Sequence, residues 1–212
     1  GQQVGVFSDV ACTSFFPSKN LGAAGDAGMM FTADSEVAER LRRLRVHGSA
    51  AQYQHTEVGI NSRLDEVQAL VLRHKARRLR EWMAGRRRIA EAYRERLKGL
   101  EAAEKITLPA VMEGRTHVYH QFTVRIPDGR RDAVRAYLTD KKFGCQVYYP
   151  VPLHKQPCFK GLLPQGDRLR LPQTDLASAE VLSLPIFPEL TDAEVDEVCT
   201  VLADALGAGG RA

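Results

Sequence analysis

The sequence lacks the features that would mark a membrane protein, a secreted disulfide scaffold or a metal centre. It has no run of about 18 apolar residues, so no segment is expected to span a membrane. Nor does it start with a charged region and an apolar core, as a secretory signal would. Its four cysteines are scattered, without a CxxC pair or a histidine at zinc spacing, which argues against a metal site or a disulfide framework. We expect buried free thiols in the reducing cytoplasm.

The composition is that of an ordinary globular protein. The chain has 212 residues, of which 44% are hydrophobic and 26% charged, enough to bury a substantial core in one large domain or in parts of two. The low aromatic content of 7% does not indicate disorder, because the hydrophobic fraction remains high. The net charge of +4 is small and becomes informative only where basic residues cluster along the chain.

The pattern of apolar residues predicts an α/β chain with helices and strands in alternation. Buried strands are expected at residues 4–8 and 28–33, and further strands at residues 118–126 and 145–149. Helices are expected from Asp34 or Ser35 to residue 46, over residues 64–100 with a break at Gly85, and over residues 129–142. A capping box of Thr191 and Glu194 predicts a final helix to about residue 206. Residues 47–62 form a long excursion, which inside a compact domain is usually functional or contacts a partner.

Lys19 lies in an unusual setting between an apolar run and a glycine-rich loop. Phe15, Phe16 and Pro17 precede it, and three glycines follow within nine residues. A partly dry pocket lowers a lysine pKa and frees the amine as a nucleophile or base, and glycines let a backbone approach a ligand closely. Residue chemistry alone leaves two interpretations open, a Schiff-base lysine and a surface lysine in a glycine turn. The spacing is not that of a Walker A loop.

Four ordered motifs resemble one family of enzymes. Ser14-Phe-Phe-Pro-Ser-Lys-Asn-Leu-Gly with Gly25-Asp-Ala-Gly resembles the lysine segment of the DegT/StrS-type sugar aminotransferases, which depend on pyridoxal phosphate (PLP). Arg45-Val-His-Gly, Gly59-Ile-Asn-Ser-Arg-Leu-Asp-Glu-Val-Gln-Ala and Val147-Tyr-Tyr-Pro-Val-Pro-Leu-His-Lys-Gln match in the same order. The resemblance spans essentially the whole chain. Among subfamilies the sequence looks most like the UDP-2-acetamido-2-deoxy-3-oxo-glucuronate aminotransferases.

The resemblance implies a cofactor site made of Lys19, Ser14 and Asn61. Lys19 matches the lysine that binds PLP covalently and then moves the proton during transamination. Ser14 matches a hydroxyl that donates to the PLP phosphate. Asn61 matches an amide that reaches the phosphate bound to the neighbouring subunit, where its NH₂ group can donate without titrating. Asn61 is also placed to cap the helix expected from Leu64.

The resemblance also implies substrate contacts at Arg63, Tyr148 and Tyr149. Arg63 is similar to an arginine that contacts the sugar substrate, and a guanidinium fork suits an acidic group or a pyrophosphate. Tyr148 and Tyr149 match residues that the small domain places over the sugar. Many relatives carry His-Tyr-Pro there, and Tyr148 cannot carry the positive charge of a histidine. Core packing is the competing interpretation for both tyrosines, and a structural hydrogen bond is expected for His154.

As a whole, the resemblance implies a fold-type-I PLP-dependent transferase of α/β class. Residues 1–63 would be the C-terminal end of its large domain, residues 64–100 a connecting helix and residues 101–212 the small C-terminal domain. The implied reaction aminates a keto group on a nucleotide-linked sugar for amino-sugar biosynthesis, with an amino-acid donor, usually glutamate. The implied assembly is a homodimer with shared active sites. The family's N-terminal half, which completes the site, is missing, so the 212 residues alone are not expected to hold PLP tightly or turn over.

Two other functions remain to be weighed. A catalytically inactive relative with a regulatory or binding role is disfavoured by the presence of Lys19. A nucleic-acid-binding protein is suggested by the basic stretch of residues 73–98, which holds 11 of the 30 basic residues. Glu81, Glu91 and Glu95 interrupt that stretch, and no base-reading motif accompanies it. A solvated helix face, or one that meets acids of a dimer partner, is the preferred interpretation.

Overall fold

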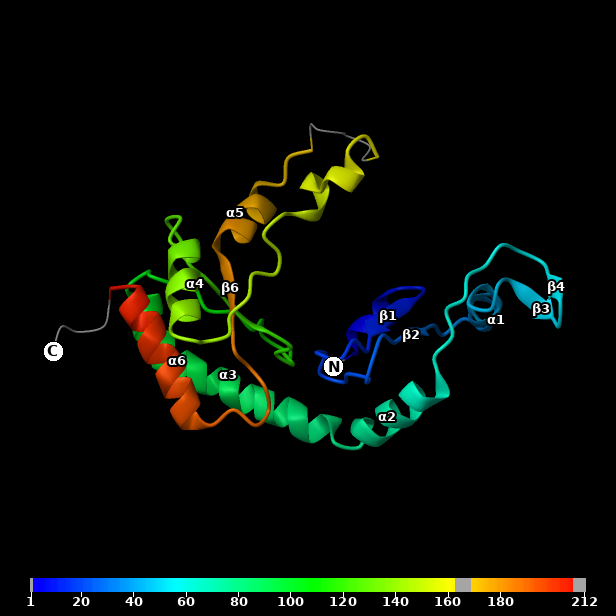
Figure 1. The fold of residues 1–212 in the computed structure, drawn as a ribbon, viewed down its shortest axis with the longest axis horizontal. Helices are drawn as coiled ribbons and strands as arrows, with labels where there is room; N and C mark the ends of the chain where they lie inside the picture. Colours follow the sequence, from blue (N-terminus) through cyan, green and yellow to red (C-terminus); the bar gives the residue numbers. More distant parts are fainter. Residues whose placement is uncertain (1, 163–168, 208–212) are drawn as a thin grey trace. The chain divides into compact units, whose positions relative to one another are not determined.

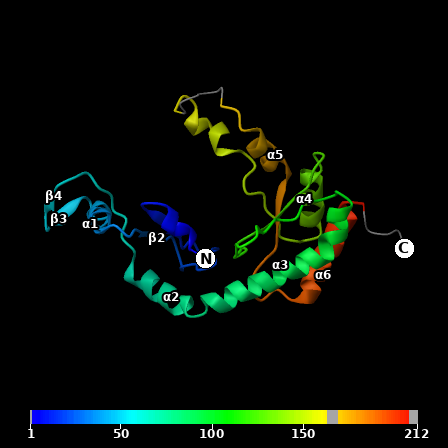
Figure 2. The same cartoon turned by 180° about the vertical axis from the view of Figure 1, so that it is seen from behind.

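The computed structural model describes residues 2–162 and 169–207 and divides the chain into two compact units, Gly1–Glu81 and Trp82–Ala212. Figure 1 and Figure 2 draw the ribbon from opposite sides and label its helices and strands. Each unit has a hydrophobic cluster of its own. The cluster of the first unit is small and that of the second is much larger.

The first unit opens with the short 3-10 helix η1, Val4–Phe7, so the strand expected over residues 4–8 is wrong. A run as short as Val-Gly-Val-Phe has no period that separates strand from helix. The first strand is instead β1, Ala11–Ser14, which pairs antiparallel with β2, Gly28–Phe31. This pairing sets Ser14 opposite Gly28 and closes the loop between them at its base.

Strand β2 confirms a strand within residues 28–33, but its expected burial is wrong. Met29, Met30 and Phe31 are 45%, 42% and 51% exposed. Among the described residues, β1 and β2 pair only with each other, and a two-stranded ribbon has little surface of its own with which to cover them.

Helix α1, Ser35–Leu44, begins where the sequence predicts. The Asp34 carboxylate accepts the backbone N–H groups of Glu36 and Val37 at 2.8 and 3.1 Å, which satisfies two donors that the helix itself cannot pair. The long excursion that follows contains a small hairpin of β3, Ser49–Ala51, and β4, Gln54–His55.

The long helical stretch is broken, but not at Gly85 as expected. Helix α2 spans Glu66–Ala76 and helix α3 spans Leu79–Ala102, so the break falls between them. Gly85 lies inside α3, where a Cβ atom would be 2.9 Å from the Pro188 carbonyl oxygen. This glycine therefore permits a close approach of two backbones, a role that sequence alone does not distinguish from a break.

The second unit is built on the antiparallel pair β5, Phe122–Arg125, and β6, Val181–Leu184. β5 confirms a strand within residues 118–126. The strand expected over residues 145–149 is wrong, since the only ladder contact within that described segment is an isolated bridge between Gln146 and Ser183.

Three α-helices follow α3 in the described part of the second unit, and the sequence predicts two of them. α4, Arg131–Asp140, confirms the helix within residues 129–142, and α6, Asp192–Ala205, begins at the predicted capping box. The Thr191 hydroxyl accepts from the Glu194 N–H, and the Glu194 carboxylate accepts from the Thr191 N–H. The sequence did not indicate α5, Pro172–Glu180, or the short 3-10 helices η2, Leu153–Lys155, and η3, Pro157–Phe159.

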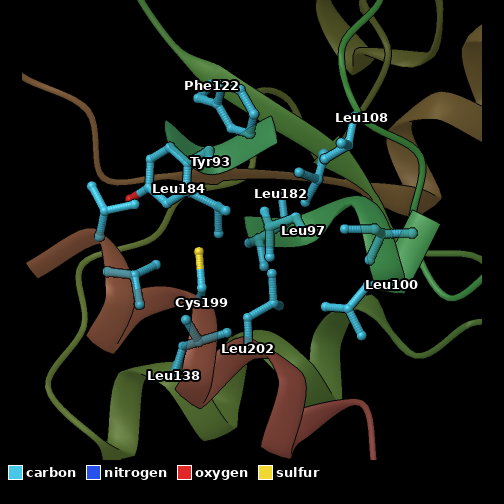
Figure 3. Close-up of a cluster of buried hydrophobic side chains, with 14 of the residues drawn as sticks. Tyr93, Leu97, Leu100, Leu108, Phe122, Leu138, Leu182, Leu184, Cys199 and Leu202 are labelled. Carbon is cyan, nitrogen blue, oxygen red and sulfur yellow. The ribbon is translucent and has the colours of Figure 1, made fainter. Parts of the chain in front are cut away.

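The core of the second unit joins α3, α4 and α6 to the β5–β6 pair, as Figure 3 shows. Tyr93 stacks on Phe122 at 4.9 Å between ring centroids, and its hydroxyl donates to the Pro185 carbonyl at 2.8 Å. Leu97 and Leu202 are almost fully buried beside them. Burial of such side chains supplies most of the folding free energy.

The four cysteines are all free, but they are not all buried as expected. Cys199 lies within the core, Cys145 is half-buried, and Cys12 and Cys158 are exposed. The described residues contain no group of three potential metal ligands and no helix long and apolar enough to cross a membrane.

Eight of the eleven basic residues of the basic stretch are exposed, in agreement with the solvated face expected, whereas Arg86 is buried. The buried Arg86 guanidinium donates to the carbonyl oxygens of Tyr119, His120 and Ile186 at 3.0, 3.1 and 3.0 Å. Seven of its eleven basic side chains bind carbonyls or carboxylates of this chain, namely Lys75, Arg78, Arg86, Arg88, Arg94, Arg96 and Lys98. These contacts account for much of the charge without nucleic acid.

Candidate active site

Lys19 lies on a loop that is closed upon itself. Directly after β1, the Phe15 N–H donates to the Ala27 carbonyl at 2.8 Å, and the Ala23 N–H donates to the Phe15 carbonyl at 2.7 Å. Phe15 is buried between these partners, while Lys19 is half-buried. The Lys19 N–H donates to the Phe16 carbonyl, so the lysine sits on a tight turn above an aromatic anchor.

Helix α2 supports the loop from one face. Gln68, Leu72 and Lys75 follow one another at spacings of four and three, which places them on the same side of the helix. The Gln68 side chain accepts the Ala24 N–H at 2.8 Å, Leu72 packs in the cluster with Phe15, and the Lys75 ammonium donates to the Gly22 carbonyl. Polar and apolar contacts together fix the Lys19 loop to α2.

Ser14, Asn61 and Arg63 line one cavity of about 1170 Å³ in the first unit. The structure therefore brings these three predicted residues together, although Lys19 is not part of this lining. Ser14 ends β1, while Asn61 pairs with Val46 in an isolated bridge. The cavity also takes in the exposed β2 side chains Met29 and Phe31.

The hydrogen bonds inside the cavity leave donors available to an anion. The Ser14 hydroxyl oxygen accepts the Phe16 N–H at 3.2 Å, so its own proton can point elsewhere. The Asn61 amide oxygen accepts from Arg63 Nε at 3.0 Å, which leaves the Asn61 NH₂ group and the two terminal nitrogens of Arg63 as donors. This donor set fits a phosphate group.

Asn61 is held in place by a pair of glycines and not by the start of a helix. A Cβ atom on Gly48, whose φ is +71°, would lie 1.7 Å from the Glu57 carbonyl oxygen, and one on Gly59 would lie 2.2 Å from the Gly48 nitrogen. Asp65 occupies the N-cap position of helix α2 without a side-chain cap hydrogen bond, and the Asn61 amide oxygen accepts from Arg63, so the expectation that Asn61 forms part of the cap is wrong.

Glu57 ties the segment before Asn61 to helix α1. Its carboxylate accepts from Arg40 Nε at 3.0 Å and from Arg43 Nε at 3.3 Å. The hydrogen bond from Arg40 is the main reason that the pKa of Glu57 lies below its usual range. The hairpin that precedes Asn61 is thus joined to α1 by side chains as well as by backbone.

Arg45 is a residue of the cavity to which the sequence assigned no role. It lies at the C-terminal end of α1, lines the cavity and is half-buried. Its guanidinium has no ion-pair partner among the described residues, and its carbonyl accepts the Ser62 N–H at 2.9 Å. The available signal was its position at the head of the Arg-Val-His-Gly motif.

Tyr148 and Tyr149 lie in the second unit, and the structure does not group them with Lys19 or Asn61. They are 43% and 68% exposed, which rules out core packing within this chain. Their rings meet edge to face with centroids 5.7 Å apart. The structural hydrogen bond expected for His154 is not found among the described residues, because its Nε2 lies 3.4 Å from Asp175 Oδ1 without forming one.

Comparison with known proteins gives one consistent result. Residues 1–203 match the model of the DegT/DnrJ/EryC1/StrS aminotransferase family. A UDP-N-acetyl-3-dehydro-alpha-D-glucosamine 3-aminotransferase of Acidithiobacillus ferrooxidans is 44% identical over 97% of this chain and 53% of its own length. The UDP-2-acetamido-2-deoxy-3-oxo-D-glucuronate aminotransferase of Pseudomonas aeruginosa is 39% identical over 93% and 52%.

Solved structures agree with the sequence relatives. DesV of S. venezuelae, in complex with a ketimine intermediate, superimposes with a TM-score of 0.87 at 40% identity, covering 97% of this chain and 54% of that one. NtdA of Bacillus subtilis, with bound cofactor PMP, gives a TM-score of 0.85 at 28% identity, covering 97% and 48%. The α/β fold expected from the sequence is the fold of these aminotransferases.

The chain belongs to the DegT/DnrJ/EryC1/StrS aminotransferase family. It spans about half the length of the curated relatives that it matches. The resemblance to that family is confirmed, and the glucuronate subfamily is represented among its relatives without being singled out.

Proposed function

We propose that the whole protein transfers an amino group from an amino acid, most simply glutamate, to the keto group of a nucleotide-linked sugar, with PLP as cofactor. The observation that carries this proposal is the conjunction of the closed Lys19 loop with the donors of Ser14 and Asn61. The names of its relatives support a 3-keto sugar on a nucleoside diphosphate.

The residues of this chain have distinct tasks in that reaction. PLP, when bound, supplies an electron sink that stabilises negative charge at the carbon bearing the amino group. Lys19 Nζ would hold the cofactor covalently and would carry the proton to and from that carbon. The Ser14 hydroxyl and the Asn61 NH₂ group would donate to the phosphate. Arg63 would bind an anionic group of the substrate through its terminal nitrogens.

Arg45 belongs to the same proposal, as a cation beside the phosphate donors. It lines the cavity with Ser14 and Asn61 and lacks an ion-pair partner among the described residues. A half-buried arginine without a counter-ion is stabilised by a bound anion. Tyr148 and Tyr149 are proposed to contact the sugar, since both rings are accessible.

The proposed organisation follows the family. Residues 1–63 would form the C-terminal end of the large domain, and residues 101–212 would form the small domain. Residues 64–100 would be the helix that connects the two domains. The boundary between the two compact units, after Glu81, falls inside the connecting stretch. We also propose a homodimer in which Lys19 and Asn61 serve one cofactor from different subunits. Within one chain Asn61 lines the same cavity as Ser14, so the assignment of Asn61 to the partner's cofactor rests on the resemblance to the family.

Borohydride trapping of the purified whole protein tests the proposal. Reduction in the presence of PLP should add one pyridoxyl phosphate to the peptide carrying Lys19, and the Lys19→Ala variant should lose both the adduct and the visible absorbance band. The matched control is Lys98→Ala, an exposed lysine paired with Glu95, which should keep both. A protein that retains its band in Lys19→Ala, or an adduct on another lysine, contradicts the assignment.

A further inference from the structure

The segment that carries Tyr148 and Tyr149 is held to the second unit on both sides. Before the tyrosines, the Gln146 N–H donates to the Ser183 carbonyl at 3.1 Å, and the Ser183 N–H donates to the Gln146 carbonyl at 2.7 Å. This bridge fixes Gln146 to strand β6. After the tyrosines, the chain enters the 3-10 helix η2. The position of the two exposed rings therefore depends on β6 and on η2.

The connection between the tyrosines and η2 is stiff. Pro150 and Pro152 fix two of its φ angles, because the proline ring locks that torsion. The Lys155 N–H donates to the Pro152 carbonyl at 2.9 Å, and Gln156 Nε2 donates to the Val151 carbonyl at 3.4 Å. A displacement of η2 is therefore passed on to the tyrosines.

Asp175 of helix α5 is the residue that holds η2. Its Oδ1 atom forms an ion pair with Lys155 Nζ at 2.7 Å and lies 3.4 Å from His154 Nε2. The His154 side chain is only 7% exposed, and its Nε2 atom has no hydrogen-bond partner among the described residues. A carboxylate beside Nε2 favours the tautomer with its N–H group there. One carboxylate of α5 thus faces two neighbouring side chains of η2.

Helix α5 is itself fixed to the core of the second unit. The Glu180 carboxylate, at the end of α5, accepts from Arg125 Nε of strand β5 at 2.8 Å. The Ser178 carbonyl accepts from the Arg131 guanidinium of helix α4 at 3.1 Å. A continuous set of contacts therefore leads from β5 and α4 through α5 to η2.

We propose that Asp175 is a positioning residue for the sugar substrate. Through its contacts with η2, it holds Tyr148 and Tyr149 in the place from which they contact the sugar. This inference rests on the proposed function, which assigns that contact to the two tyrosines. An exposed ion pair alone contributes little, but here the carboxylate also faces the buried His154 side chain. Asp175 itself touches neither cofactor nor substrate, so its loss affects only the half-reaction that uses the sugar.

The two half-reactions of the whole protein separate this role from a general loss of structure. Glutamate should bleach the visible band of the PLP-loaded protein. The band should return with UDP-N-acetyl-3-dehydro-alpha-D-glucosamine, the keto sugar in the name of the Acidithiobacillus ferrooxidans relative. Asp175→Asn should raise the keto-sugar concentration that gives the half-maximal rate by about tenfold, the effect of a modest misplacement of binding groups. The glutamate half-reaction should change by less than about twofold, because it does not use the tyrosines.

Glu197→Gln is the matched control. It removes the charge of an exposed carboxylate on helix α6 that has no ion pair among the described residues. Both half-reactions should keep the rates of the unaltered protein.

Hydrogen exchange gives a readout that does not depend on turnover. In the whole protein, Asp175→Asn should speed amide exchange in the peptide that covers residues 150–160 and leave exchange in helix α6 unchanged. Lys155→Gln is a second, exposed change that spares the buried side chain of His154. It should act in the same direction on both measurements, with an increase of about two- to threefold in the keto-sugar concentration.

Equal losses in both half-reactions would overturn the positioning role. Faster exchange with an unchanged keto-sugar dependence would also overturn it, because the segment would then be held by Asp175 without serving the sugar. So would unchanged exchange in both variants. A failure of the proposed function differs from these results, since the unaltered protein would itself show no bleaching by glutamate or no recovery with the keto sugar.

Discussion

Gly22 is the position where a single methyl group would disturb the Lys19 loop most. A Cβ atom there would lie 2.2 Å from the Pro17 carbonyl oxygen, a backbone atom that cannot move alone. We expect Gly22→Ala to destabilise the first unit by about 1–3 kcal/mol and to weaken PLP retention. The measurement is urea unfolding together with bound cofactor.

Gly99 provides the matched control for that substitution. It lies inside α3, and an added Cβ atom would meet no heavy atom within 4 Å, so Gly99→Ala should stabilise the second unit by about 0.5–1 kcal/mol. If Gly22→Ala unfolds at the same urea concentration as the unaltered chain, the close contact at Pro17 is not a constraint.

Cys199 should be the least reactive thiol of the chain. Burial in the core raises its pKa to about 12, so almost no thiolate forms near neutral pH, whereas Cys12 and Cys158 are exposed. Iodoacetamide at pH 8 should label Cys12 and Cys158 rapidly and reach Cys199 only after unfolding. Labelling of Cys199 in the folded chain at the rate of Cys12 would contradict its burial.

The same raised pKa has a consequence for alkaline stability. In the unfolded chain the Cys199 thiol loses its proton at its ordinary pKa of 9.0, but in the folded chain it keeps it up to about pH 12. The folded state therefore binds the extra proton in this window, and stability must fall as pH rises through it. Cys199→Ala should lose that slope.

At the scale of elements, Arg86 joins helix α3 to two other segments of the second unit. Its guanidinium satisfies three carbonyl groups, and Arg86→Met would leave these acceptors buried and unpaired. We expect a loss of about 3 kcal/mol or more, because each hydrogen bond to a charged group is worth about 1.5–3 kcal/mol. Thermal unfolding measures it.

Arg87 is the natural control, since it is the next residue of α3 and lacks a partner among the described residues. Arg87→Gln should change stability by no more than about 0.5 kcal/mol. An equal loss for Arg86→Met and Arg87→Gln would show that helix propensity, and not the carbonyl contacts, determines the effect.

The elements that could be predicted are those whose ends carry their own chemistry. Asp34 and Thr191 cap α1 and α6 with side-chain hydrogen bonds to nearby residues, and both caps can be found in sequence. The end of helix α2 at Ala76 depends on partners elsewhere in the fold. The same is true of the close backbone contacts that require glycine at positions 48 and 59. No local pattern encodes those partners.

The candidate site was predictable to a similar extent. The motifs named Ser14, Asn61 and Arg63, and the structure places all three on one cavity. A role for Arg45 could not be predicted, because the local sequence does not distinguish a half-buried arginine without a counter-ion from a surface arginine. The support of the Lys19 loop by Gln68 and Lys75 escaped for the same reason, since it joins residues 44 and 53 positions apart.

At the scale of the whole molecule, the proposed homodimer predicts complementation between two inactive variants. Lys19→Ala and Asn61→Ala should each lose activity in the whole protein. If the residues serve one cofactor from different subunits, mixed dimers retain one intact site of two, and random exchange restores about a quarter of the activity. Measured transamination after co-refolding at equal amounts gives the answer. No recovery, with mixed dimers demonstrated by mass, would place both residues in the same subunit's site.

The contacts of Arg86 also imply a delay between the synthesis of helix α3 and the synthesis of its packing partners. Its partner carbonyl at Ile186 lies 100 residues further along the chain. Helix α6, which packs on the apolar face of α3, is separated from α3 by a similar length of chain. At about 5–20 residues per second, the ribosome needs roughly 5 to 20 s to deliver those partners. During that interval Ile89, Tyr93 and Leu97 lack the β6 and α6 side chains that complete their core. The nascent chain should therefore be a chaperone client for most of the synthesis of its second unit.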